Sequence, residues 1–447
     1  MSRTLTFKLG AIGLLILLLL IALLMIGGVV DERQALRNEV LQDIARSSSE
    51  AQKITGPLLV VPYRKRVRTW KTHDKTGERY MVESQREGRL YFLPDRLSLD
   101  GDLGTELRKR GIYEARLYHV DSKVSADFVL PVNYGISEGL EDYRFERAYL
   151  ALGISDIRGI KNDLRLRLGS SQLPFAPGSQ EALLGAGVHA PLPALDSSVA
   201  QRLGFSFELA LQGSSRLYIA PVGRESLVNL KSDWPHPSFI GDYLPTQRNV
   251  DDSGFSARWQ TSFFATNMEE ALKDCVAKSD CHAFNQRQFG VSLVDPVDQY
   301  LMTDRAIKYA LLFIGLTFAA FFLFEVLKRL AVHPVQYGLV GLSLALFYLL
   351  LVSLSEHGAF ARAYAVSASA CVLLIGFYVS HVLHSWLRGL GFSLALAILY
   401  GMLYGLLSAE DYALLMGSIL VFALLACVMV LTRKLDWYGV GRPAAAE

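Results

Sequence analysis

Residues 9–30 read LGAIGLLILLLLIALLMIGGVV, an apolar run of 22 residues without a charged side chain. At about 1.5 Å per residue, a helix of this length covers a bilayer core of about 30 Å. Arg3 and Lys8 precede the run, and Asp31 and Glu32 follow it. A cleaved secretory signal has a shorter apolar core and a small-residue cleavage site. We therefore interpret residues 1–30 as an uncleaved transmembrane anchor.

Five further apolar stretches predict membrane-spanning helices at the C-terminus. They cover residues 306–327, 335–355, 363–383, 390–408 and 412–431, within a segment 306–433. Basic residues follow every other span, at Lys328, Arg388 and Arg433, and acidic residues mark the opposite ends. By the positive-inside rule, both termini are expected in the cytoplasm, including the tail 434–447, and residues 31–305 in the periplasm.

The 31–305 segment has ordinary polarity and predicts a β-rich domain behind a short helix over residues 31–52. Apolar residues alternate with polar ones along 124–130, 164–168 and 205–211, as expected for strands with one buried face. Asp100-Gly101 is interpreted as a turn, and the proline-rich stretch 174–200 as a long loop. The predicted fold class is an α+β membrane protein. Its large antiparallel, sandwich-like domain lies between the first membrane helix and a five-helix bundle.

Composition excludes several classes of function. The chain is 51% hydrophobic and 20% charged, with a net charge of +2 and no basic block with interleaved aromatic residues, so we predict no nucleic-acid partner. No phosphate-binding GxxxxGK[ST] loop and no HExxH motif are present. His381 and His384 share a helix face, but further ligands are missing nearby. We predict no metal site, no cofactor and no catalytic set.

The segment Ser232–Pro245 is the most unusual stretch for binding. Its prolines hold Trp234 and His236 out of helical geometry. The segment predicts either a binding surface or a structured crossover in which Trp234 fills the core. The candidate interaction residues are Trp234, His236, Phe239, Asp242 and Trp259.

Few ionisable residues fall in or near the predicted spans. Glu325 is expected at the cytoplasmic interface, paired with the cations that follow it, and Glu356 and His357 at the outer end of the third span. Gly401 and Gly405 predict close helix packing. Cys275 and Cys281 are expected either to form a disulfide in an oxidising compartment or to remain two unpaired thiols.

Ordered strings of the sequence include Asp233-Trp234-Pro235-His236-Pro237, Gly241-Asp242-Tyr243-Leu244-Pro245, Thr303-Asp304-Arg305-Ala306, His333-Pro334 and Leu354-Ser355-Glu356-His357. These strings resemble the CreD family of inner-membrane proteins. The resemblance spans nearly the whole chain, matches least over 140–200, and does not include the cysteine pair. It implies an inner-membrane protein linked to cell-envelope integrity and to a regulon under a two-component sensor, without a known reaction or ligand.

The expected function is a non-enzymatic contribution to envelope integrity or to the envelope stress response. In this hypothesis the lipid bilayer holds the helices, and the periplasmic domain contacts an envelope component. One alternative is a transporter or lipid-handling protein, which requires a cavity among the spans. A second is a membrane-embedded hydrolase, which requires a converging nucleophile or metal set.

Overall fold

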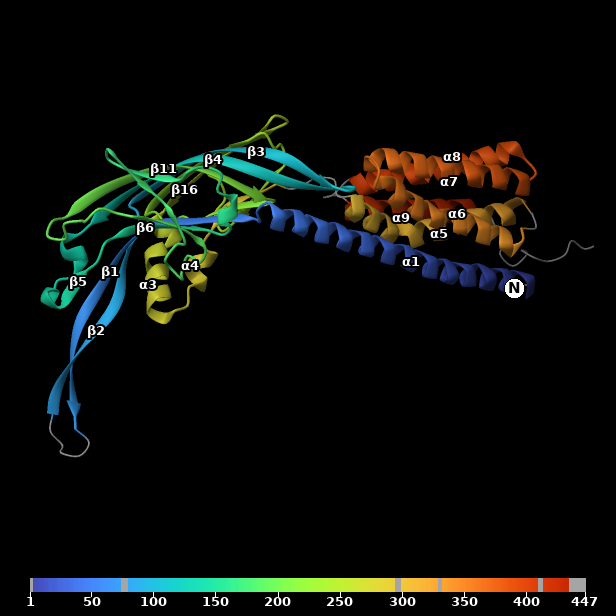
Figure 1. The fold of residues 1–447 in the computed structure, drawn as a ribbon. Coiled ribbons are helices and arrows are strands. Elements are labelled where there is room, and N and C mark those ends of the chain that lie inside the picture. The colour runs from blue at the N-terminus through green and yellow to red at the C-terminus, as the bar shows by residue number, and fades with distance from the viewer. Residues whose placement is uncertain (1–2, 74–78, 294–298, 329–331, 409–412, 434–447) are drawn as a thin grey trace, which may run out of the picture. The chain divides into compact units, whose positions relative to one another are not determined.

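The computed structural model describes residues 3–73, 79–293, 299–328, 332–408 and 413–433. The chain divides into two compact units. A helical unit contains residues 1–39 and 297–447, and a β-rich unit contains residues 40–296 (Figure 1).

Within the described residues, six long helices contribute to the helical unit. Five of them, α1 and α5 to α8, contain segments long and apolar enough to cross a membrane. The helix α9 lies where the sixth span is predicted. Their bounds are α1 Arg3–Ser47, α5 Gln299–Lys328, α6 Pro334–Ser355, α7 Phe360–Val382, α8 Trp386–Ser408 and α9 Ala413–Thr432.

The start of α6 shows how sequence sets a helix boundary. His333 accepts a hydrogen bond from the backbone N–H of Val335, and Gln336 accepts one from the N–H of His333. Pro334 occupies the first helical position, where a missing N–H costs nothing. This cap satisfies N–H groups that would otherwise be unpaired at the helix end.

Two sheets form the β-rich unit, and the strand order of the first is β14-β17-β12-β1-β6-β10-β9, with β2 and β5 also pairing with β1. Its strands are β1 Gln52–Thr72, β2 Arg79–Phe92, β5 Tyr143–Phe145, β6 Tyr149–Ile154, β9 Ala176–Pro177, β10 Gly187–Pro191, β12 Arg216–Ile219, β14 Pro237–Gly241 and β17 Phe289–Leu293.

The second sheet has the order β15-β16-β13-β3-β4-β11-β7-β8. Its strands are β3 Arg96–Arg110, β4 Tyr113–Leu130, β7 Arg165–Leu168, β8 Ser171–Pro174, β11 Gln201–Ser214, β13 Glu225–Ser232, β15 Gln247–Asp251 and β16 Gly254–Ser262. The short helices α2 Phe263–Thr266, α3 Met268–Lys278 and α4 His282–Gln286 follow β16.

One hydrophobic core joins the two sheets, as the sandwich prediction requires. The alternating residues expected on strands are confirmed, because each is at most 2% exposed on β4 and β11. They are Val124, Ala126, Phe128, Leu130, Phe205, Phe207, Leu209 and Leu211.

The sheets depart from a wholly antiparallel arrangement at two strand pairs. β1 pairs with β12 in parallel, and β3 pairs with β13 in parallel. Long connections separate the members of each pair, so their direction is not fixed by a tight hairpin turn.

Two local predictions were wrong. Asp100 and Gly101 lie inside β3, opposite Lys123 and Ser122 of β4, rather than in a turn. The predicted loop 174–200 contains β9 and β10, and β10 pairs with β6. Gly187 is the first residue of β10. Only glycine fits at this position, because a Cβ there would lie 2.1 Å from the carbonyl oxygen of Leu152. This glycine marks close strand approach rather than a loop.

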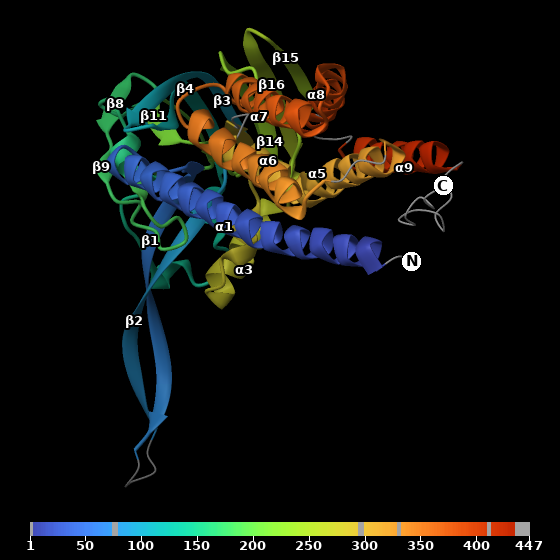
Figure 2. The ribbon, with the colours of Figure 1, turned by 90° about the vertical axis from the view of Figure 1, so that its right-hand side faces the viewer.

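The hairpin formed by β1 and β2 extends beyond both sheets (Figures 1 and 2). Its register runs from Leu59 opposite Phe92 to Thr72 opposite Arg79. The inner part of β1 is buried, whereas the outer part is exposed on both faces.

Candidate functional site

The proline-rich segment holds its tryptophan in a defined position. The guanidinium carbon of Arg116 lies 3.6 Å from the centroid of the Trp234 ring. The indole N–H donates a 3.0 Å hydrogen bond to the backbone oxygen of His236. Since Trp234 is half-buried and its ring is engaged on one face, much of the side chain supports the segment itself.

Trp259 was wrongly included among the residues predicted to contact a partner. It is 0% exposed, and its ring stacks on Phe289 at 5.3 Å and meets Phe239 edge-on at 5.7 Å. Its N–H donates to the backbone oxygen of Tyr243. Trp259 is therefore a core residue, and its side chain is not accessible to a partner.

The exposed part of the segment is polar with one apolar residue. His236 and Asp242 are exposed, Phe239 is half-buried against the core, and Leu244 is 68% exposed. These side chains form the candidate contact surface, which we define as His236, Asp242 and Leu244.

Cys275 and Cys281 form a disulfide, with their Cα atoms 4.3 Å apart. The bond closes the short connection between α3 and α4. Cys275 is buried in the core of the β-rich unit, and Cys281 packs against that core.

Glu325 lies in a buried polar cluster within the helical unit. Its side chain is 5% exposed and forms an ion pair with Lys8 of α1. The Tyr337 hydroxyl donates to it at 2.8 Å, and the backbone N–H of Val332 donates at 3.2 Å. The expected pairing with Lys328 and Arg329 falls on side chains outside the described part of the structure. Because Lys8 was expected only as a topology signal, its link to Glu325 was missed.

A second cluster surrounds Glu356. Arg33 of α1 lies 3.6 Å from this carboxylate, and the Tyr300 hydroxyl of α5 donates to it at 3.1 Å. His357 is exposed and contacts the backbone oxygen of Ser353. The two clusters thus fasten α1 to α5 and α6 at two points, one near each end of α6.

A hollow of about 630 Å³ lies between α7 and α8. Its lining combines aromatic residues with small ones, including Tyr364, Tyr400, Ala368 and Gly401. No heavy atom lies within 4 Å of a Cβ placed at Gly401, so close packing at this glycine was wrongly predicted. Close approach of α7 and α8 occurs instead at Gly376 and Gly389, which contact Ser393 and Ser380.

Sequence reasoning also missed a buried carboxylate, Glu181, in the β-rich unit. Its side chain is 1% exposed and accepts hydrogen bonds from the hydroxyls of Tyr91 and Tyr149, the former at 2.6 Å. The Arg89 guanidinium lies 3.5 Å away. Burial, followed by the hydrogen bond to Glu181 and then by its charge, raises the pKa of Tyr91 and Tyr149 well above the usual range. Arg89 and Tyr91 lie on β2, Tyr149 lies on β6, and Glu181 lies in the connection between β9 and β10. Because these segments are far apart in the sequence, no local spacing could reveal the cluster.

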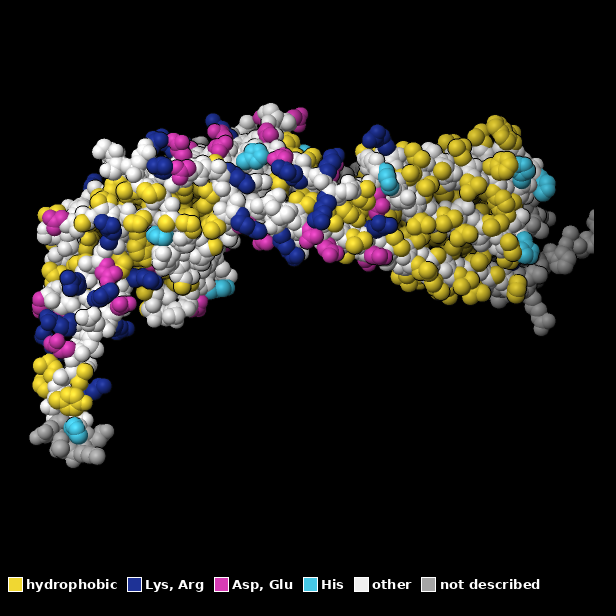
Figure 3. Space-filling model, in the orientation of Figure 1, with side chains coloured by type: hydrophobic (Ala, Val, Ile, Leu, Met, Phe, Trp, Pro, Cys, Tyr) yellow, Lys and Arg dark blue, Asp and Glu magenta, His cyan; other side chains and the backbone are white. Residues whose placement is uncertain are grey.

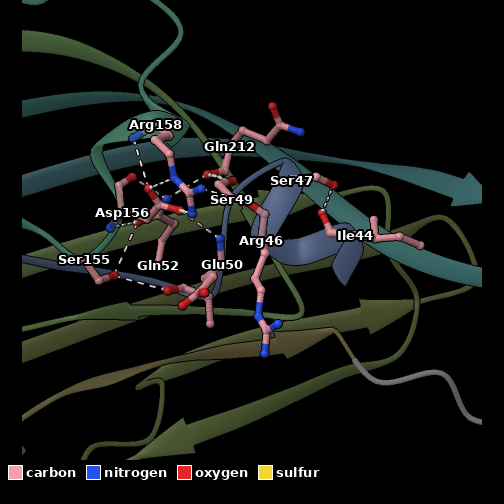
Figure 4. Close-up of polar contacts among 11 residues, drawn as sticks. Ile44, Arg46, Ser47, Ser49, Glu50, Gln52, Ser155, Asp156, Arg158 and Gln212 are labelled. Atoms are coloured by element: carbon pink, nitrogen blue, oxygen red, sulfur yellow. Dashed lines mark hydrogen bonds and ion pairs between the residues drawn. The ribbon is translucent and has the colours of Figure 1, made fainter. Parts of the chain in front are cut away.

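A hydrogen-bond network joins the end of α1 to the sheets (Figure 4). Arg158 donates at 2.7 Å to the backbone oxygen of Arg46, near the C-terminus of α1. Gln52 bonds the backbone oxygens of Asp156 and Gln212, both at 2.9 Å. Asp156 in turn binds the Arg158 guanidinium, which lowers the pKa of that carboxyl. The network caps the helix where β1 begins.

Within the described residues, no three His, Cys, Asp or Glu side chains group as a metal site would require. His381 contacts the backbone oxygen of Phe377, and His384 that of Val382. The pair therefore makes local backbone contacts.

Comparison with known proteins decides the family. The sequence model of the family described as "Inner membrane protein CreD" matches residues 4–438. The chain belongs to the CreD family. One CreD relative, "Inner membrane protein CreD" of Escherichia coli (strain K12), is 40% identical over 429 residues, covering 96% of this chain and 92% of the relative. The resemblance noted in the sequence is confirmed, and the chain is an inner-membrane protein.

Among solved structures, a similar one is an M1 zinc metallopeptidase from Deinococcus radiodurans. It is 11% identical, covers 38% of this CreD-family chain and 39% of its own, and has a TM-score of 0.21. A likeness this weak says nothing about fold or activity.

Proposed function

We propose that this CreD-family protein supports cell-envelope integrity without catalysing a reaction. In this proposal the helical unit crosses the inner membrane, both termini face the cytoplasm, and the β-rich unit lies in the periplasm. There the surface of His236, Asp242 and Leu244 contacts an envelope component.

The observation that carries the proposal is the direction of three helices. Lys8, Glu325 and Tyr337 meet in one cluster, whereas Arg33, Tyr300 and Glu356 meet in the other. Hence α1 and α6 run in the same direction, and α5 runs in the opposite one. This alternation supports the proposal that the residues between α1 and α5 share one side of the membrane, opposite to Lys8.

Complementation tests the proposed contact surface. Cells that lack the gene are expected to become sensitive to detergent, and the wild-type gene restores resistance. The pair His236→Ala and Asp242→Ala should fail to restore it at a normal protein level, since both side chains are exposed. The matched control is Arg248→Ala with Asn249→Ala, an exposed pair on β15, which should restore resistance.

Replacing Trp234 together with His236 separates the two interpretations of this segment. If the segment mainly binds a partner, function is lost while the protein level stays constant. If Trp234 mainly supports the fold, the protein level falls, as expected when a ring packed under a guanidinium is removed. Full function of every variant in this segment would contradict a contact there.

A second candidate function, lipid handling, is favoured by the hollow between α7 and α8. Its lining is mostly apolar, and a volume of about 630 Å³ suits an acyl chain. Ala368→Phe should fill the hollow and impair envelope integrity if lipid enters it. Leu394→Phe, at an exposed position on α8 outside the hollow, is the matched control.

A further inference from the structure

The outer part of the β1–β2 hairpin exposes large apolar side chains. Trp70 is 67% exposed, Met81 is 50% exposed and Tyr80 is 48% exposed. Figure 3 shows hydrophobic side chains gathered toward the end of this hairpin. We call Trp70, Tyr80 and Met81 the hairpin aromatic–methionine patch.

The strand register places this patch on both faces of the ribbon. Trp70 lies directly opposite Met81, and Tyr80 lies opposite Lys71. Since successive side chains alternate between faces, Trp70 and Met81 share one face and Tyr80 occupies the other. A partner that surrounds the end of the ribbon suits this arrangement better than one that covers a single face.

The same hairpin is strongly basic. Between residues 64 and 89 the sequence contains nine Lys and Arg residues and four Asp and Glu residues, a local charge of 9 − 4 = +5. The sequence stretch Arg64–Lys71 is therefore a basic block that ends beside a tryptophan. The prediction that the chain contains no basic block with aromatic residues was wrong. The near-neutral total charge hid this local excess.

Some cations of the hairpin are paired with carboxylates, and others are not. Arg64 and Arg66 form ion pairs with Glu146 and Asp142, and Arg68 pairs with Glu83. By contrast, within the described part of the chain, no carboxylate lies within ion-pair distance of Lys71, Arg79 or Arg86. The structure also places Arg86 directly opposite Lys65. Like charges in this position repel each other, so an external anion would stabilise them.

We propose that the β1–β2 hairpin binds the surface of a bilayer that contains anionic lipid. The aromatic–methionine patch enters the interfacial layer, where tryptophan and tyrosine are favoured on both sides of the ribbon. Lys71 and Arg79 bind lipid phosphates beside the patch and Arg86 binds one farther along the ribbon, since basic residues are attracted to anionic headgroups. The inference adds a lipid contact to the proposed function and depends on it only for placing the hairpin beside an envelope membrane.

Co-sedimentation tests the proposal with the full chain in nanodiscs of phosphatidylcholine. Sucrose-loaded vesicles that contain phosphatidylglycerol should pull down the wild type, and vesicles of phosphatidylcholine alone should not. Trp70→Ser with Met81→Ser should reduce binding at least about tenfold, because two interfacial side chains are lost. Lys71→Gln with Arg79→Gln and Arg86→Gln should reduce it similarly and weaken its salt dependence.

Matched controls separate the hairpin from general surface effects. Phe264→Ser removes a side chain that is 93% exposed on α2, and it should leave vesicle binding unchanged. Arg202→Gln with Lys231→Gln and Arg248→Gln removes three exposed cations elsewhere in the β-rich unit, and it should do the same. Brominated lipid should quench wild-type fluorescence more than that of Trp70→Phe.

Three results would overturn the proposal. They are equal binding to neutral and anionic vesicles, unchanged binding of both hairpin variants, and capture by DNA or isolated peptidoglycan without capture by vesicles. None of these results would affect the outcome of the complementation experiment, which tests the proposed function separately. If hairpin variants fail to restore detergent resistance while vesicles do not bind, the proposed function stands and the lipid identity is wrong.

Discussion

A single buried carboxylate shows how much one residue contributes to the β-rich unit. Removing Glu181 would leave the hydroxyls of Tyr91 and Tyr149 without their acceptor and Arg89 without its counter-charge. Glu181→Ala should therefore lower the free energy of unfolding by about 3 kcal/mol, and Glu181→Gln by less.

Denaturant unfolding followed by tryptophan fluorescence measures this loss. Glu208→Ala is the control, because Glu208 is 69% exposed at its side chain and pairs at 3.6 Å with an exposed Arg167. It should cost less than about 1 kcal/mol. Equal losses for both sites would show that the Glu181 cluster adds no stability.

The carboxyl of Asp156 predicts a pH dependence for the joint between α1 and β1. The hydrogen bond from Arg158, with two backbone N–H groups, lowers its pKa in the folded state. The unfolded state therefore takes up a proton first as the pH falls. The stabilisation is present above a pH of about 4 and is lost as the pH falls through the folded-state pKa.

Asp156→Asn should consequently flatten the decline in stability below a pH of about 4, compared with the wild type. Thermal unfolding at several pH values measures the slope, with the exposed Asp163→Asn as control. If the stability of the Asp156 variant declined with falling pH as steeply as that of the wild type, the Asp156 carboxyl would not be the cause of the decline.

For single residues, the sequence predicted local backbone constraint better than burial. The prolines around Trp234 correctly indicated a constrained segment, yet Trp259 was assigned to a surface although it stacks within the core. Both are aromatic residues beside polar ones in sequence. Trp259 follows Phe255 and Ala257 at every second position of β16, and this alternation with polar residues already indicates that it points inward.

Among the elements, α1 depends on buried polar contacts as well as on apolar packing. Glu325→Ala would leave Lys8, Tyr337 and the N–H of Val332 without their shared acceptor. We expect a loss of about 3 kcal/mol in the stability of the helical unit. Thermal aggregation of the detergent-solubilised protein measures it, and Glu32→Ala, at an exposed position on α1, is the control. Equal melting of the two variants would contradict a role for the cluster.

Glycine positions make a second prediction for the helices. A Cβ at Gly389 would lie 2.7 Å from the Cα of Ser380, which cannot move without shifting α7. Gly389→Leu should therefore destabilise the helical unit by at least about 1–3 kcal/mol. Gly401→Leu enters the hollow and should be tolerated, so similar yields and melting temperatures for both variants would contradict the α7–α8 packing.

Helix existence was predictable here, whereas helix faces were not. Long uncharged runs require lipid or a core around them, and this determined the spans. The Gly401–Gly405 spacing could not reveal which glycines meet a neighbour, since that depends on how α7 and α8 are rotated. The structure assigns the contact to Gly376 and Gly389.

For the whole molecule, the sequence predicted the order of parts and the α+β class. The distribution of apolar runs and flanking charges follows directly from the cost of placing charge in lipid. Strand order depends on contacts between distant segments, such as β3 with β13, for which no local pattern exists. The mixed sheets therefore emerged only from the structure.

The placement of the β-rich unit outside the cell membrane is the claim on which the proposed function depends. Labelling of introduced cysteines with a membrane-impermeant maleimide tests it in intact spheroplasts. Phe264→Cys, at a side chain 93% exposed in the β-rich unit, should react before the membrane is opened. Arg433→Cys, at an exposed position after α9, should react only afterwards. Unmodified protein measures the background from the four native cysteines, of which Cys275 and Cys281 are bonded and Cys371 is buried. The reverse order of labelling would place the β-rich unit in the cytoplasm and contradict the account.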